Sequence, residues 1–438
     1  MNKTIAMISL GCAKNLVNSE QMLYLLSEAG FAIAPEPDGA DAVIINTCGF
    51  IDAAKSEAID TILEMAELKN AGRLGKIIVT GCLTERYREE VRNELPEIDG
   101  VLGVGNYKDI VETVQKCFDG EDVSRFDNNS APVDEIGRVV TTGPAWAYLR
   151  IAEGCNNFCA FCAIPYIRGR YRSREIENIV EEAKDLAAHG VKELIVIAQD
   201  ITRYGTDLYG KRSLAELCRR LKEIEGIQWI RLHYLYPDQF DDELIDEIAS
   251  NEKVVKYLDI PIQHINNKIL KSMNRRGNGD EIRTLFKKLR ERIPGLVLRT
   301  SLIAGLPGEG DAEFEELCEF LKEARIERAG VFPFSPEEGT PAAKMEYPDA
   351  EIAQKRAELI NELQAQIMDD YCNAQIGKTL EVLCEDYDED YQMYVGRSYA
   401  DSPDIDGLVF FEGEGREGDI VNVKISSVQD GYLFGEQC

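Results

Sequence analysis

The sequence lacks any uninterrupted apolar run of the ~18 residues that a membrane span needs. Its first segment, MNKTIAMISLGC, has no signal-peptide cleavage pattern and passes directly into a strand-like stretch. We therefore expect a cytoplasmic protein with no membrane as a partner. Hydrophobic residues still make up 44% of the 438-residue chain, which is enough to build cores for about three domains.

Basic residues are also scarce. The chain has 49 Lys and Arg against 79 Asp and Glu, which gives a formal net charge of -30 at pH 7. Such an excess of acid repels nucleic acid and attracts basic proteins over a long range. We expect a basic partner and no nucleic acid as the main target, although ordinary solvation of the surface would also account for the charge.

The order of apolar runs predicts an α/β chain. Residues 3–119 alternate strands with amphipathic helices, as in a parallel α/β domain, and the polar residues 120–140 resemble a linker. Residues 141–371 contain six further strand–helix units, which predict a partial (β/α)6 barrel. Residues 374–438 contain short strands punctuated by glycine and predict a small antiparallel β-barrel. The strands predicted for the partial barrel are WAYLRI, ELIVIA, QWIRLHY, KYLDIPI, LVLRTSLI and AGVFPF.

The strongest motif is Cys155-x3-Cys159-x2-Cys162, which directly follows the first strand of the partial barrel. In a cytosolic chain such cysteines indicate metal binding or catalysis. Three thiolates can hold three irons of a four-iron cluster, and the fourth iron then stays open for a cofactor or substrate. Phe158 and Phe161 would shield the cluster, and Phe161 is also a candidate cofactor contact. The alternative, a zinc site, lacks a fourth ligand at a suitable spacing.

Three other cysteines share a position relative to predicted strands. Cys12, Cys48 and Cys82 each lie just past a strand, at separations of 36 and 34 residues. Parallel strands end at the same edge of a sheet, so the three thiols should meet and form a second three-cysteine cluster site. The neighbouring glycines would allow close backbone approach; they are Gly11, Gly49 and Gly81. The alternative is three buried structural cysteines.

The cysteine triplet, with an aromatic residue before its last member, resembles the radical S-adenosylmethionine superfamily. The resemblance implies that the open iron binds the amino and carboxylate groups of S-adenosylmethionine, whose cleavage gives a 5′-deoxyadenosyl radical. The whole chain resembles the methylthiotransferases of that superfamily, which share the same three-part order and end in a TRAM domain. By this resemblance the chain needs two [4Fe-4S] clusters, two S-adenosylmethionine molecules per turnover, a sulfide or other sulfur source, and an electron donor such as flavodoxin or ferredoxin.

Polar residues and glycines at the ends of the barrel strands are candidates for binding S-adenosylmethionine. The alternative is that such residues are helix caps or loop residues. The candidates are Gln199, Asp200, His233, Gln263, Gly305 and Glu309. A basic run follows the triplet and could bind an anionic group or form salt bridges with nearby acids; it comprises Arg168, Arg170, Arg172 and Arg174.

The methylthiotransferase family divides between enzymes that modify an adenosine in tRNA and one that modifies an aspartate of ribosomal protein S12. Residues 374–438 contain 15 Asp and Glu but only 4 Lys and Arg, a net charge of -11. Such a module would repel phosphate and attract a basic ribosomal protein. The sequence also resembles the protein-modifying branch over residues 256–277, 331–343 and 396–411. We therefore predict methylthiolation of the aspartate β-carbon, with a modified tRNA adenosine as the alternative. The acidic residues predicted to bind the substrate protein are Asp404, Asp406, Glu412 and Glu414.

Overall fold

The computed structural model describes residues 3–133 and 136–438. The chain forms two compact units. The first contains the N-terminal 141 residues together with residues 152–173 and 335–343. The second contains residues 142–151, 174–334 and 344–438. Residues 134 and 135, which belong to the predicted linker 120–140, lie outside the described residues.

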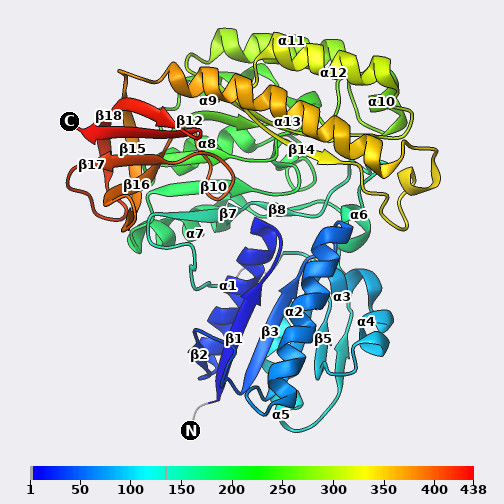
Figure 1. The fold of residues 1–438 in the computed structure, drawn as a ribbon. Helices are drawn as coiled ribbons and strands as arrows, with labels where there is room; N and C mark the ends of the chain where they lie inside the picture. The colour runs from blue at the N-terminus through cyan, green and yellow to red at the C-terminus, as the bar shows by residue number, and fades with distance from the viewer. Residues whose placement is uncertain (1–2, 134–135) are drawn as a thin grey trace. The chain divides into compact units, whose positions relative to one another are not determined.

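The first unit is built on a six-stranded sheet in which every pair of neighbouring strands is parallel (Figure 1). Its strands are β1 (Thr4–Ser9), β2 (Ala32–Ala34), β3 (Ala42–Thr47), β4 (Lys76–Gly81), β5 (Gly100–Leu102) and β6 (Val123–Arg125), in the order β2-β1-β3-β4-β5-β6. Its helices are α1 (Ala13–Glu28), α2 (Asp52–Asn70), α3 (Cys82–Tyr87), α4 (Glu89–Glu94) and α5 (Ile110–Phe118), preceded by the short η1 (Tyr107–Asp109). The predicted parallel α/β domain is confirmed.

The predicted start of the linker is wrong by several residues. Strand β6 falls inside it and pairs with β5, so the sheet continues past residue 119. A three-residue strand, VSR, contains too few apolar residues to be recognised by periodicity.

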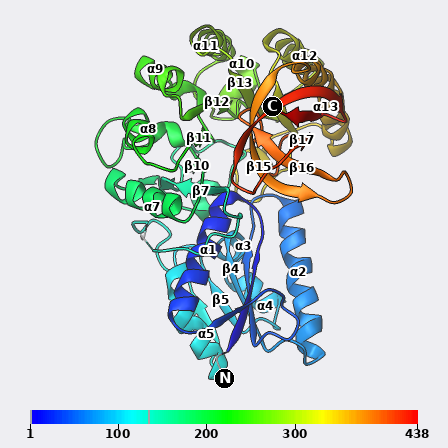
Figure 2. The same ribbon diagram turned by 90° about the vertical axis from the view of Figure 1, so that its left-hand side faces the viewer.

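Alternate side chains of the sheet face two separate cores. Val43 and Ile45 of β3 pack with α2, α3 and α4 on one face, whereas Ile44 packs with α1 and α5 on the other face. Figure 2 shows this division of the helices. The near-continuous apolar character of β3 follows, because both faces of a doubly covered parallel sheet are buried.

The second unit contains another six-stranded sheet, in the order β14-β13-β12-β11-β10-β7, with all neighbouring strands parallel. Its strands are β7 (Trp146–Arg150), β10 (Glu193–Ile197), β11 (Trp229–Leu232), β12 (Val254–Asp259), β13 (Val297–Ala304) and β14 (Arg328–Pro333). These are the six strands predicted from the sequence. The helices between and after them are α7 (Ile176–Ala188), α8 (Leu214–Lys222), α9 (Asp242–Ser250), α10 (Asn267–Ser272), α11 (Gly279–Arg292), α12 (Asp311–Ala324) and α13 (Ala350–Asn373). Short turns η2 (Ile201–Arg203) and η3 (Pro237–Gln239) follow β10 and β11, and η4 spans Ala342–Lys344.

The C-terminal residues of the second unit form a closed five-stranded barrel. Its strands are β15 (Thr379–Asp388), β16 (Met393–Ser398), β17 (Val409–Glu412), β18 (Ile420–Gln429) and β19 (Tyr432–Gln437). Val382, Phe411 and Val423 fill its interior. Closure confirms the predicted barrel, but the prediction of a purely antiparallel barrel is wrong at one pair, because β17 and β19 run parallel.

The cysteine triplet lies between two short strands of the first unit, β8 (Ala152–Glu153) and β9 (Arg172–Ser173), and helix α6 (Ile164–Ile167) follows the last cysteine. The triplet loop therefore clusters with the N-terminal sheet, although the chain reaches it through β7 of the other sheet. Among the described residues, no helix is both long enough and apolar enough to cross a bilayer.

Candidate functional site

Cys12, Cys48 and Cys82 all lie at the carboxyl edge of the N-terminal sheet. Strand β1 ends at Ser9, β3 at Thr47 and β4 at Gly81, so each thiol follows its strand within three residues. The chain turns outward from β1 to β2 and then returns to β3 on the other side, so a topological switch lies between β1 and β3. Open α/β sheets bind their ligands at this position, beyond the carboxyl ends of the strands.

The glycines beside these thiols permit close contact between the loops, as the sequence predicts. Gly11 has φ +86°, and a Cβ added to it would lie 2.7 Å from Cβ of Cys48. A Cβ on Gly49 would lie 2.7 Å from the backbone of Leu83. The three loops are thus in direct contact, and the structure brings together the three predicted cysteines.

Asn15, which the sequence analysis missed, ties the same three loops together. Its amide nitrogen donates to the carbonyl oxygens of Leu10 and Thr47, each at 2.9 Å. Its side-chain oxygen accepts a hydrogen bond from Arg168 and lies 3.8 Å from Sγ of Cys82. An asparagine three residues after Cys12, in the first turn of α1, was the available signal.

The three thiols differ in acidity. Burial, followed by the nearby Cys82, raises the pKa of Cys48 to about 11. Burial also raises the pKa of Cys82, although Arg168 opposes the shift. At Cys12 the surrounding protein removes hydration and so raises the pKa, but Lys14 and Arg168 outweigh this effect, and the net result is a lowered pKa. Positive charge is therefore present where iron ligands must lose protons.

The second triad occupies the β8–β9 loop. Cys159 is buried, whereas Cys155 and Cys162 are partly exposed. The N–H of Cys162 donates to the carbonyl of Cys159 at 3.0 Å, and the N–H of Asn157 lies 3.5 Å from Sγ of Cys155. Phe158 has φ +50°, a strained conformation for a bulky residue. These contacts give the triplet loop a defined turn between Cys155 and Cys162.

Direct contacts join the sheet-edge triad to the segment that carries the cysteine triplet. Cys82 packs against Ala163 and Ile167 of the triplet segment. Arg168 is 3% exposed, and its guanidinium lies 2.9 Å from Glu153 and 3.3 Å from Asn18 of α1. The segment that carries one triad is therefore anchored to the sheet edge that carries the other.

Arg168 of the predicted basic run lies beside the sheet-edge cysteines, with its guanidinium against Cys82. Arg174 pairs with Glu182 at 2.6 Å, and Arg172 donates to backbone carbonyls. Arg170 lies over the ring of Phe158, 4.7 Å from its centroid. The alternative of salt bridges with nearby acids is confirmed for Arg168 and Arg174.

The donor sets of both triads suit iron–sulfur clusters. Within residues 3–133 and 136–438, no three Cys, His, Asp or Glu side chains are arranged around a single metal-ion position. A four-iron cluster instead takes one thiolate on each of three irons. Each triad supplies three soft thiolates, so Cys12, Cys48 and Cys82 could hold one cluster and the triplet another.

Three of the strand-end residues predicted to bind cofactor have structural partners. Asp200 caps η2, accepting from the N–H of Thr202 at 3.1 Å and from Arg203 at 3.0 Å. Glu309 accepts from the N–H of Gly305 and from Arg356, each at 2.9 Å. A Cβ on Gly305 would lie 2.4 Å from Cβ of Ala353 in α13. These contacts give Asp200, Gly305 and Glu309 structural roles, and cofactor binding by the three residues remains a prediction.

The remaining candidates occupy different environments. His233 is buried, and its Nε2 lies 3.0 Å from the hydroxyl of Ser402, which follows β16. Gln263 has φ +70° and bridges to β13 through the backbone of Ser301 and Ile303. Gln199 and Phe161 are partly exposed. Cofactor binding by Phe161, Gln199, His233 and Gln263 remains a prediction.

One predicted substrate contact is corrected. Asp404, Glu412 and Glu414 are exposed, but the side chain of Asp406 is 3% exposed. It accepts hydrogen bonds from the Tyr257 hydroxyl at 2.6 Å and from the Ser402 N–H at 2.9 Å. Asp406 therefore anchors its loop to β12, and a protein substrate cannot reach it.

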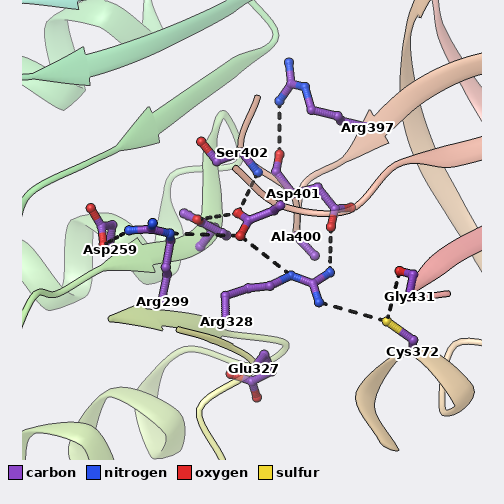
Figure 3. Close-up of polar contacts among 12 residues, drawn as sticks. Asp259, Arg299, Glu327, Arg328, Cys372, Arg397, Ala400, Asp401, Ser402 and Gly431 are labelled. Atoms are coloured by element: carbon purple, nitrogen blue, oxygen red, sulfur yellow. Dashed lines mark hydrogen bonds and ion pairs between the residues drawn. The ribbon is translucent and has the colours of Figure 1, made fainter. Parts of the chain in front are cut away.

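Neighbouring residues strengthen this anchor in the second unit (Figure 3). Arg328 of β14 pairs with Asp401 at 2.6 Å, and Arg299 of β13 pairs with Asp259 of β12 at 2.9 Å. Arg397 of β16 donates to the carbonyl of Asp401 at 3.0 Å. The loop after β16 is thus held by a buried polar network on the parallel sheet.

Three family models match the chain. The Radical SAM superfamily model matches residues 149–321, the model of Uncharacterized protein family UPF0004 matches residues 4–103, and the TRAM domain model matches residues 376–437. Over its whole length the chain is 47% identical to ribosomal protein uS12 methylthiotransferase RimO of Acetivibrio thermocellus, of which it covers 98%. The chain belongs to the RimO family. A RimO of the same description from Clostridium botulinum strain Hall is 48% identical, over 98% of this chain and 97% of that protein.

Solved structures support the fold of this RimO-family chain. The radical S-adenosylmethionine methyltransferase TsrM from Kitasatospora setae gives a TM-score of 0.57 at 15% identity, over 78% of this chain and 77% of that one. The cobalamin-dependent S-adenosylmethionine radical enzyme OxsB gives 0.52 at 13% identity, over 84% and 56%. At such low identity these likenesses concern the fold alone. Within the RimO-family chain, the N-terminal match contains Cys12, Cys48 and Cys82, and the radical match contains the triplet.

Proposed function

We propose that this chain is a radical S-adenosylmethionine methylthiotransferase that acts on ribosomal protein uS12. In the reaction, the β-carbon of one aspartate exchanges a C–H bond for a C–S–CH3 group. Two S-adenosylmethionine molecules, a sulfur atom and electrons from a reductant such as flavodoxin or ferredoxin are consumed. We place this reaction in the cytoplasm, where the substrate protein is made.

The observation that carries the proposal is the pairing of two three-cysteine sites in one compact unit. We assign Cys155, Cys159 and Cys162 to the cluster that binds S-adenosylmethionine, and the sheet-edge triad to the auxiliary cluster. When bound, the two clusters supply electron transfer and the site of sulfur delivery. An aspartate β-carbon has no proton acidic enough for a general base near neutral pH, so radical chemistry from a cofactor is required.

The residues around the cysteines have positioning roles. Asn15 holds the ends of β1, β3 and β4 in register through its contacts with Leu10, Thr47 and Cys82. Arg168 supplies a buried positive charge that offsets the negative charge of thiolates. Phe158, with Arg170 over its ring, covers part of the triplet loop and limits the access of water.

Charge supports a protein substrate over tRNA. The C-terminal barrel carries a net charge of -11, and Asp404, Glu412 and Glu414 are exposed on it. A phosphate backbone would be repelled by this surface, whereas a protein rich in Lys and Arg would be attracted.

A deletion strain tests the choice of substrate. Mass spectrometry of its uS12 and of its bulk tRNA should show that uS12 has lost one methylthio group while the tRNA modifications are unchanged. Loss of methylthiolated adenosine together with unchanged uS12 would show that tRNA is the substrate.

A further inference from the structure

A groove of about 420 Å³ lies between α2 and the α3–α4 pair in the first unit. Its floor is apolar, because Leu83, Val91 and Leu95 line it while also belonging to the core beneath α2. Ile59 of α2 and the ring of Tyr87 form the walls. The rim carries the carboxylates of Glu90 and Glu94, which pair with no described cation, together with Asp52, which pairs with Lys55 on the same rim.

Helix α2 presents apolar side chains on its outer face as well as toward the sheet. Ala58 and Ile62 are fully buried, whereas Ile59 is 37% exposed and Leu63 is 43% exposed. Single exposed apolar residues are common and need no explanation. Ile59 and Leu63, however, lie one turn apart on α2, and Ile59 also lines the groove with the apolar floor. Together they form a surface suited to an apolar side chain of a partner.

Among the described residues, most carboxylates on α2 and α4 have no cation as a partner; the exception is Asp52, which pairs with Lys55. Both lysines of α2 are engaged, Lys55 with Glu337 at 3.2 Å and Lys69 with Asp99 at 2.5 Å. Seven acidic residues of α2 and α4 form no ion pair with any described residue; they are Glu57, Asp60, Glu64, Glu67, Glu89, Glu90 and Glu94. Exposed acids elsewhere are often paired, as Asp246 is with Arg292. This surface is therefore complementary to a basic partner.

The groove adjoins the sheet-edge cysteines. Helix α3 begins at Cys82, so Leu83 on the groove floor is the next residue. Helix α2 begins at Asp52, four residues after Cys48. A Cβ on Gly49 would lie 2.7 Å from the backbone of Leu83. A chain segment bound in the groove would therefore lie beside the proposed auxiliary site.

We propose that this α2–α4 groove binds a basic segment of the substrate protein, with an apolar side chain in the groove and Lys or Arg side chains against the acidic rim. The inference rests on the proposed function and adds a second contact surface to the C-terminal barrel. Grooves of this kind bind short amphipathic segments. Nucleic acid and a second copy of this acidic chain both carry the wrong charge for the rim.

The first test is a matched pair of charge reversals in the full-length, cluster-loaded enzyme. The test variant is Glu90→Lys/Glu94→Lys on α4. The control is Glu315→Lys/Glu319→Lys on α12, where both residues are also exposed, one turn apart and without an ion pair to any described residue. We expect the test variant to raise the KM for recombinant uS12 about tenfold at low salt. The control should leave this KM unchanged, and 5′-deoxyadenosine formation without uS12 should be equal in both.

A direct binding measurement separates the two proposals. If wild type binds uS12 and the test variant does not, but no methylthiolation occurs, the proposed function fails and the groove stands. If wild type methylthiolates uS12 and both double variants behave alike, the groove assignment is overturned and the function stands.

The apolar part of the groove is tested by Ile59→Ser/Leu63→Ser. Both side chains are exposed, so thermal unfolding should stay close to that of wild type while the Kd for uS12 rises. Sedimentation checks for a second copy as the occupant. A wild-type dimer that this variant converts to monomer, with unchanged uS12 affinity, would overturn the proposal.

Discussion

The guanidinium of Arg168 lies 2.9 Å from the carboxylate of Glu153, and both side chains are buried. Glu153 stands two residues before Cys155, and Arg168 also contacts Asn15 and Asn18 in α1. This one pair therefore connects the loop of the cysteine triplet to the helix that begins beside Cys12. This pair therefore helps to fix the position of the triplet loop relative to the sheet-edge triad within the first unit.

Removing one partner of this buried pair should destabilise the fold strongly. We expect Arg168→Met to lower the free energy of unfolding by about 3–5 kcal/mol, because the buried carboxylate of Glu153 loses its guanidinium partner. Urea unfolding of the apoprotein measures the loss. The double variant Arg168→Met/Glu153→Gln should recover part of it. A single variant as stable as wild type would show that the pair does not hold the loop.

Gly11 should be essential for cluster binding because a side chain at this position would collide with Cys48, in addition to straining the backbone. Gly11→Ala places a Cβ 2.7 Å from Cβ of Cys48, at φ +86°. Gly39→Ala is the matched control, because Gly39 has φ +84° but no atom within 4 Å of an added Cβ. Both variants carry a backbone strain of about 1–3 kcal/mol, yet only Gly11→Ala should reduce the iron content after anaerobic reconstitution. Equal iron in the two variants would contradict the close packing of the cysteine loops.

The sequence predicted most of this site for clear reasons. Cys48 and Cys82 follow apolar strands, so parallel topology alone places them at one edge, and the triplet spacing is local. Asn15 and Glu153 were missed because their roles depend on contacts across the fold. Asp406 was assigned wrongly because acidic residues are exposed on average. Its burial depends on a hydrogen bond from the hydroxyl of Tyr257, which is 149 residues away in the sequence.

The buried carboxylate of Glu193 gives a pH-dependent test of the link between the C-terminal barrel and the parallel sheet. It pairs with Arg231 of β11 at 2.6 Å and with Arg397 of β16 at 2.7 Å. Burial alone would raise the pKa of Glu193, but the two guanidinium groups outweigh it and lower the pKa below 4.5. The stabilisation is therefore complete above about pH 4.5 and disappears as the pH falls through the lowered pKa.

We expect Glu193→Gln to be less stable than wild type by about 3–5 kcal/mol at pH 7, because two buried guanidinium groups lose their shared partner. The difference should shrink as both proteins are acidified below about pH 4. Urea unfolding at several pH values measures it. A difference that is constant with pH would mean that the charge of Glu193 is unimportant.

Asp406 and the exposed acids of the barrel should respond differently to mutation. Asp406→Ala leaves the hydroxyl of Tyr257 and the N–H of Ser402 without an acceptor and should cost about 1–3 kcal/mol of stability for each group. Glu412→Lys/Glu414→Lys should leave thermal unfolding unchanged but weaken uS12 binding and flatten its salt dependence. Unchanged uS12 affinity in the latter variant would mean that this acidic face only solvates the barrel.

The central claim is that the enzyme methylthiolates uS12 and that its two cysteine triads have different roles in this reaction. The direct measurement incubates reconstituted wild type, Cys159→Ala and Cys48→Ala with S-adenosylmethionine, a sulfur source, a reductant and recombinant uS12, and follows 5′-deoxyadenosine and the mass of uS12. Wild type should form 5′-deoxyadenosine and add one methylthio group to an aspartate. Cys159→Ala should form neither product, whereas Cys48→Ala should still form 5′-deoxyadenosine but leave uS12 unmodified. Equal loss of 5′-deoxyadenosine in both variants, or no methylthio group on uS12 with wild type, would contradict the account.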